Sequence, residues 1–103
     1  MNKTAYQIIF CIVNAGFAQT VMEAAKKAGA KGGTILRARG TANPEAEEFF
    51  HISIQPDKEI LFIIVPTEIR DAVMHKIYED TGLAENSQSI AFSLPVTHTV
   101  GLH

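Results

Sequence analysis

Cysteine is scarce in this chain, because Cys11 is the only one among 103 residues. A single cysteine cannot form a disulfide within the chain, which excludes a small secreted scaffold held together by disulfides. The chain also lacks an N-terminal signal pattern and any apolar run of about 18 residues, the length needed to span a membrane. We therefore expect a cytoplasmic protein with no membrane insertion.

Motifs that carry catalysis or bind nucleic acid are missing as well. No G-x-S-x-G elbow surrounds a serine, and no G-K-[ST] ends a phosphate-binding loop. The net charge is −2, so the strongly basic surface typical of nucleic-acid-binding domains is not expected. We therefore expect a protein that is not an enzyme and does not bind nucleic acid.

The four histidines show no pattern of metal ligands. No pair has H-x-x-x-H spacing, and no second cysteine could complete a ligand set. The favoured interpretation is four unrelated histidines and no metal. The alternative is a metal site that His51 or His98 forms across a contact between subunits.

Two stretches are apolar at consecutive positions, YQIIFCIV at residues 6–13 and ILFIIV at residues 60–65. A strand with one wet face alternates apolar and polar side chains, whereas a continuous apolar run must be covered on both faces. The chain has two plausible helices, enough to cover one face of a small sheet. The second layer then comes from another copy of the same chain, which predicts an oligomer.

The order of elements predicts one domain over residues 1–103. Strands are expected at residues 5–13, 34–40, 49–65 (or two short strands broken near Pro56) and 90–94, with Pro95 ending the last. Helices are expected at residues 17–28, with Asn14 as N-cap, and from Thr67 to a stop at Gly82. This order is β-α-β-β-α-β, the ferredoxin-like α+β fold: an antiparallel sheet with two helices on one face.

One candidate site emerges from the segment GGTILRARGT at residues 32–41. Alternation along the expected strand places Thr34 and Gly40 on one face, and Arg37 and Arg39 on the other. Two interpretations stay open. The glycines let a ligand approach closely and the arginines bind its phosphate or carboxylate, or the glycines make turns and the arginines bridge subunits.

Three segments together resemble the PII signal-transduction family (nitrogen regulatory protein P-II), specifically its shortened PII-like branch. They are AKKAGAKGGTILRARGT at residues 25–41, EFFHISIQPDKEILFIIVP at 48–66, and TGL followed by IAFSLPV at 81–83 and 90–96. The resemblance covers nearly the whole chain and rests on the order and spacing of these segments.

The resemblance implies a cytoplasmic regulatory homotrimer with ligand clefts between subunits, where adenine nucleotides bind in typical members. It also implies a loop at residues 41–48 that signals ligand status to a protein partner, such as a transporter or an enzyme. Thr34 matches a family threonine that meets the adenine, and Gly40 matches a glycine that lines the same cleft. Arg39 holds a basic position just before that glycine. The alternative on the same architecture is a metal-binding trimer of the divalent-cation tolerance type.

The chain departs from the family pattern where phosphates are held. Ser89 stands where typical members have a lysine, and residues 96–102 contain neither of the two arginines found there. Each lost charge-assisted hydrogen bond costs about 1–3 kcal/mol. We therefore expect weak adenine-nucleotide affinity, and a different or smaller ligand beside Thr34, Arg37, Arg39, Gly40 and Ser89.

Overall fold

The structure is a computed structural model that describes residues 5–41, 57–82 and 89–102. Over these residues the chain forms four strands and two helices in the order β-α-β-β-α-β. The elements are β1 (Tyr6–Asn14), α1 (Ala18–Lys27), β2 (Thr34–Arg39), β3 (Asp57–Pro66), α3 (Thr67–Thr81) and β4 (Ile90–Val96). The predicted strand at residues 49–56 and most of the segment at 41–48 lie outside the described residues.

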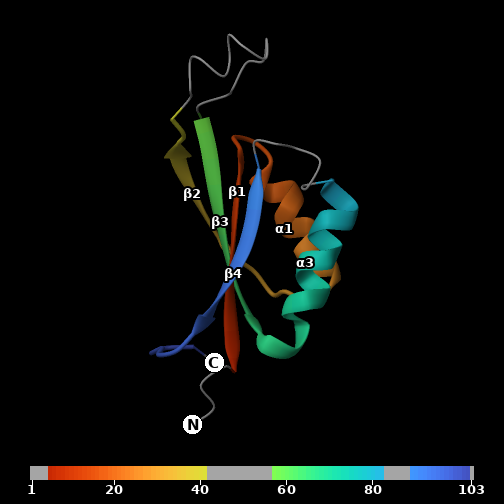
Figure 1. Cartoon of the computed structure of the whole chain (residues 1–103), viewed down its shortest axis with the longest axis vertical. Coiled ribbons are helices and arrows are strands. Elements are labelled where there is room, and N and C mark those ends of the chain that lie inside the picture. Colours follow the sequence, from red (N-terminus) through yellow and green to blue (C-terminus); the bar gives the residue numbers. More distant parts are fainter. Residues whose placement is uncertain (1–4, 42–56, 83–88, 103) are drawn as a thin grey trace.

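The four strands form one antiparallel sheet with the order β2-β3-β1-β4. The two apolar runs therefore lie in the two central strands, β1 and β3. Both helices lie on the same side of this sheet (Figure 1). The predicted ferredoxin-like arrangement is confirmed.

The core fills the space between the helices and the sheet. Every second residue of β1 faces the helices and is buried, and β3 repeats the pattern with Leu61, Ile63 and Val65. Val73 and Ile77 of α3 complete this layer. No helix in the described part of the chain is long and apolar enough to cross a membrane.

The opposite face of the sheet is also apolar, yet nothing in the described part of the chain covers it. The alternate residues that point away from the helices include Ile8, Phe10, Leu36, Ile60, Phe62, Ile64, Ile90, Phe92 and Leu94. Leu94 is 49% exposed and Ile90 55% exposed, which is unusual for side chains of this size on a sheet. This surface, called the uncovered face below, is the second apolar side that the sequence predicts.

Three phenylalanines form a row across the uncovered face. The Phe10 ring lies 4.9 Å from that of Phe62 in an edge-on arrangement, and 5.2 Å from that of Phe92 in a stacked one. These residues lie directly opposite one another on neighbouring strands. Cross-strand aromatic pairs of this kind stabilise a sheet by about 0.2–1 kcal/mol each.

The predicted N-cap of the first helix is wrong, although the predicted start at residue 17 lies within one residue of the observed one. Asn14 is the last residue of β1, and Phe17 is the N-cap of α1 without a capping side chain. The Asn14 side chain instead accepts a hydrogen bond from Lys58 Nζ at 2.6 Å, across the β1–β3 pair. The last strand is also longer than predicted, because β4 continues through Pro95 to Val96. A proline fits there because β4 is an edge strand with one neighbour, so its missing N–H faces away from the ladder.

Candidate functional site

Thr34 lies beside a hollow of about 380 Å³ on the uncovered face. It is the first residue of β2, opposite Phe62 on β3. The lining consists of Ile8, Gly32, Gly33, Thr34, Phe62 and Ile64. The hollow, called the Thr34 hollow below, thus combines apolar side chains with exposed glycine backbone and one hydroxyl.

Gly33 is fixed by its own chain and not by a ligand. A Cβ built on this residue would lie 2.6 Å from the Phe62 carbonyl oxygen and 3.0 Å from side-chain atoms of Leu61 and Met22. Real Cβ atoms do not approach a backbone oxygen so closely, so only glycine lets the strand enter its pairing with β3. At Gly32 nothing lies within 4 Å of the same position. Gly33 thus serves a close approach to β3 of the same chain, which neither interpretation of these glycines included, and ligand binding at this segment stays a prediction.

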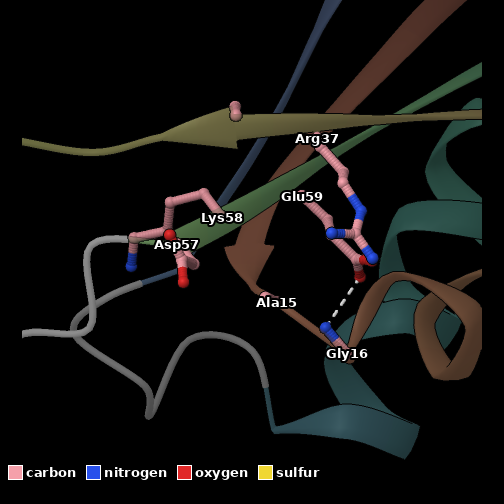
Figure 2. Close-up of a pocket in the computed structure, with 7 residues that line it drawn as sticks. Ala15, Gly16, Arg37, Asp57, Lys58 and Glu59 are labelled. Atoms are coloured by element: carbon pink, nitrogen blue, oxygen red, sulfur yellow. Dashed lines mark hydrogen bonds between the residues drawn. The ribbon is translucent and has the colours of Figure 1, made fainter.

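Arg37 and Arg39 lie on the other side of β2, away from Thr34. They are paired in register with Glu59 and Asp57, and Glu59 points towards the helices. Arg37 lines a second hollow of about 300 Å³, shown in Figure 2. Within a single chain the pleat therefore separates Thr34 from both arginines, as the predicted alternation requires. A shared cleft between subunits stays a prediction.

Gly40 and Ser89 flank the ends of strands. Gly40 is half-buried and follows β2 directly, and Ser89 is half-buried and precedes β4. β2 and β4 are the two outer strands of the sheet. Thr34 and Ser89 thus lie at opposite edges, and one chain does not bring them to the same place.

Glu59 is a structural residue that the sequence did not reveal. Its Oε1 atom accepts hydrogen bonds from the backbone N–H groups of Gly16 at 2.9 Å and Ala18 at 3.1 Å, at the start of α1. A carboxylate here satisfies N–H groups that lack partners within the helix and interacts favourably with the helix dipole. This cap comes from β3, about forty residues away in sequence, so no local sequence motif predicts it.

The described residues include two histidines, His75 and His98, and neither belongs to a cluster of potential metal ligands. His98 is exposed and its Nδ1 atom lies 3.1 Å from Thr97 Oγ1, while His75 is next to Glu79 on α3. In residues 5–41, 57–82 and 89–102 no three His, Cys, Asp or Glu side chains gather as a metal site would require. His51 lies outside those residues, so the metal-binding alternative finds no ligand set in the described part of the chain.

Cys11 is fully buried under the helices, as expected for a small apolar residue in a core strand. Burial raises the pKa of its thiol to about 12, because the thiolate would lose its hydration. The thiol therefore stays protonated at neutral pH and is a poor nucleophile.

Comparison with known proteins gives the class to which the fold belongs. The sequence matches no protein-family model and no curated protein. Its structure, however, resembles a PII-like signalling protein of Thermus thermophilus, with a TM-score of 0.66 and 21% identity over 88% of this chain and 85% of that one. It also resembles Arabidopsis thaliana PII bound to citrate, with a TM-score of 0.68 and 23% identity over 91% and 77% of the two chains.

A third similar structure is CPII of Thiomonas intermedia, which is described as a nitrogen regulatory PII-like protein. The form bound to ADP, AMP and acetate gives a TM-score of 0.64 and 13% identity over 92% of this chain and 89% of that one. The chain therefore has the PII-like fold, and the resemblance stated from sequence motifs is confirmed at that level.

Proposed function

We propose that this chain is a PII-like regulatory protein without catalytic activity, which assembles as a homotrimer and binds a small ligand in clefts between subunits. The uncovered face is the observation that carries the proposal. Large apolar patches on a soluble chain mark an interaction surface. The similar structures are signalling proteins of the PII type, which supports a second copy of the chain as the occupant.

The positions of the predicted site residues support a cleft that two subunits build. Thr34 lies at the β2 edge and Ser89 before the β4 edge, so a single ligand can meet both only if they come from different copies. A head-to-tail contact repeated around an axis closes a ring, and we propose that this contact joins the β2 edge of each subunit to the β4 edge of the next. The Thr34 hollow would then be closed by the neighbour.

The lining indicates what the ligand can be. Apolar side chains and glycine backbone around Thr34 suit a flat ring, while this chain lacks the lysine and two arginines that hold phosphates in typical PII proteins. CPII is described with ADP, AMP and bicarbonate, and Arabidopsis PII with citrate. We therefore propose a small, anionic effector or a weakly bound adenine nucleotide, with no tightly held cofactor.

Signalling is proposed to pass through residues 41–48 to a protein partner, such as a transporter or an enzyme, in the cytoplasm. This part of the proposal rests on the resemblance to PII proteins. Ligand binding can shift such a segment only through a difference in affinity between its conformations.

A ligand screen followed by subunit mixing tests the proposal. Thermal shift with nucleotides, 2-oxoacids, bicarbonate and divalent metals should reveal a stabilising effector, since a ligand at about 100 times its Kd adds about 2.7 kcal/mol. Thr34→Val and Ser89→Asp should each weaken its binding. When the two variants are unfolded together and refolded as mixed trimers, part of the binding should return, because some clefts then hold two native residues. No recovery on mixing would place the site within one chain and contradict the proposal.

A further inference from the structure

A second hollow lies on the helix side of the sheet and is separate from the Thr34 hollow. It opens where β2 and β3 come together beside the turn between β1 and α1 (Figure 2). Its lining is Ala15, Gly16, Arg37, Ala38, Asp57, Lys58 and Glu59, around about 300 Å³. The hollow, called the Arg37 hollow below, has two cations and two carboxylates among its seven residues.

Two of these four charges are held by the fold. Glu59 Oε1 accepts the N–H groups of Gly16 and Ala18, which fixes its carboxylate against the start of α1. Lys58 Nζ donates to Asn14 Oδ1 at 2.6 Å. Both groups already have structural partners. Lys58 alternates with Glu59 along β3 and, like Ile60, points towards the uncovered face, so of these two charges only the Glu59 carboxylate faces the hollow.

The other two charges have no partner in the described part of the chain. Arg37 lies opposite Glu59 and Asp57 lies opposite Arg39, but no ion pair or hydrogen bond joins the side chains of either pair. Both Arg37 and Asp57 are exposed to solvent at the mouth of the hollow. They are diagonal neighbours on two antiparallel strands, a position in which Cα atoms lie about 7–8 Å apart.

The balance of charges decides which ligand fits. A simple anion would pair with Arg37 but would also face the carboxylates of Asp57 and Glu59. A simple cation would pair with Asp57 but would also face the Arg37 guanidinium. A small molecule with one charge of each sign next to each other meets complementary charge at both ends.

We propose that the Arg37 hollow binds a zwitterionic α-amino acid, with its carboxylate on the Arg37 guanidinium and its ammonium group on the Asp57 carboxylate. A guanidinium pairs with a carboxylate through two parallel N–H···O bonds, which sets the orientation of the ligand. Because the hollow is open, the amino-acid side chain extends towards solvent, and selection among side chains is modest. This inference is independent of the proposed ligand beside Thr34.

Titration calorimetry of the full chain with L-glutamate, L-arginine and L-serine tests the inference. At least one should bind saturably at millimolar concentration. Its N-acetyl form, which lacks the ammonium charge, and its carboxamide, which lacks the carboxylate, should each bind about tenfold more weakly or worse. No binding of any of the three, or equal binding of the blocked forms, would overturn the proposal.

Matched variants locate the ligand. Arg37→Gln and Asp57→Asn should each weaken binding about tenfold, while Lys31→Gln and Thr34→Val should leave it unchanged. The Gly16 amide signal in a two-dimensional NMR spectrum should shift on titration, because Gly16 lines the hollow, and the same spectra show that each variant is folded. Loss of binding in Thr34→Val, or unchanged binding in Arg37→Gln and Asp57→Asn, would place the ligand elsewhere and contradict the inference.

Discussion

At the scale of single residues, Gly33 occupies a tightly packed position. It brings the start of β2 against the backbone of β3, and thereby places Thr34 on the uncovered face. Cys11 is a second such position, because its small side chain lies in the fully packed layer under the helices. Both residues act through packing, and both can be tested without a ligand.

Gly33→Ala should destabilise the protein by about 1–3 kcal/mol, because the new methyl group has to push β2 away from the Phe62 carbonyl. Gly32→Ala is the matched control and should change the free energy of unfolding by less than about 0.5 kcal/mol. Urea denaturation of the three proteins measures the difference. Equal stability of the two variants would show that the close approach to β3 does not exist.

Cys11 should resist alkylation in the native protein. Its thiol is buried and its raised pKa of about 12 leaves almost no thiolate at neutral pH. Iodoacetamide labelling followed by mass spectrometry should show no modification of the native protein and full modification in denaturant. Rapid labelling of the native protein at neutral pH would contradict the burial of this strand.

At the scale of elements, α1 and α3 are tied together where Asp80 meets two lysines. Asp80 lies 3.3 Å from Lys27 Nζ on α1 and 3.3 Å from Lys76 Nζ on α3. Partial burial of the Asp80 carboxyl works to raise its pKa, but hydrogen bonds from Lys27 and Lys76 outweigh this and hold the pKa below its usual range. The folded state therefore favours the ionised carboxylate.

The sign of the resulting pH dependence follows from that shift. A carboxyl whose pKa is lowered on folding contributes stability above its unfolded pKa, and loses it as the pH falls through the folded value. Between about pH 5 and pH 2, the free energy of unfolding should therefore fall more for the native protein than for Asp80→Asn. Denaturant titrations across this range, at low and high salt, measure both. An equal decline in the two proteins would show that the pairs contribute nothing in solution.

Element order and strand direction could be predicted from the sequence because each depends on local patterns. The continuous apolar runs of β1 and β3 indicated central strands, and Gly82, with a φ of 63°, ended α3 as expected. The separation of Thr34 from Arg37 also follows from simple alternation. The expectation that one ligand meets both residues concerns a cleft between subunits, and it stays a prediction.

What could not be predicted depends on contacts between distant segments. The cap that Glu59 places on α1 and the bond from Lys58 to Asn14 both cross from β3 to the β1–α1 region. The extension of β4 through Pro95 depends on the edge position of that strand, which is known only once the order of the sheet is known. In each case the signal is tertiary, and a single sequence does not carry it.

At the scale of the whole molecule, the main feature is the apolar surface of the sheet that the single chain leaves open. Phe92, Leu94 and Ile64 are exposed in one copy, and the rings of Phe10 and Phe62 that continue the row are half-buried. Burying apolar surface contributes about 25 cal/mol per Å², so a sheet face of this kind is a strong driving force for association. Leu94→Lys places a charge on this face and should weaken the assembly, whereas Lys31→Gln, an exposed change outside the face, should not.

The most direct test is the mass of the native particle in solution. Sedimentation equilibrium at micromolar concentration should give three copies of the 11.2 kDa chain, and Leu94→Lys should lower that mass. A stable monomer with the native fold, in which the uncovered face is exposed to solvent, would contradict the account.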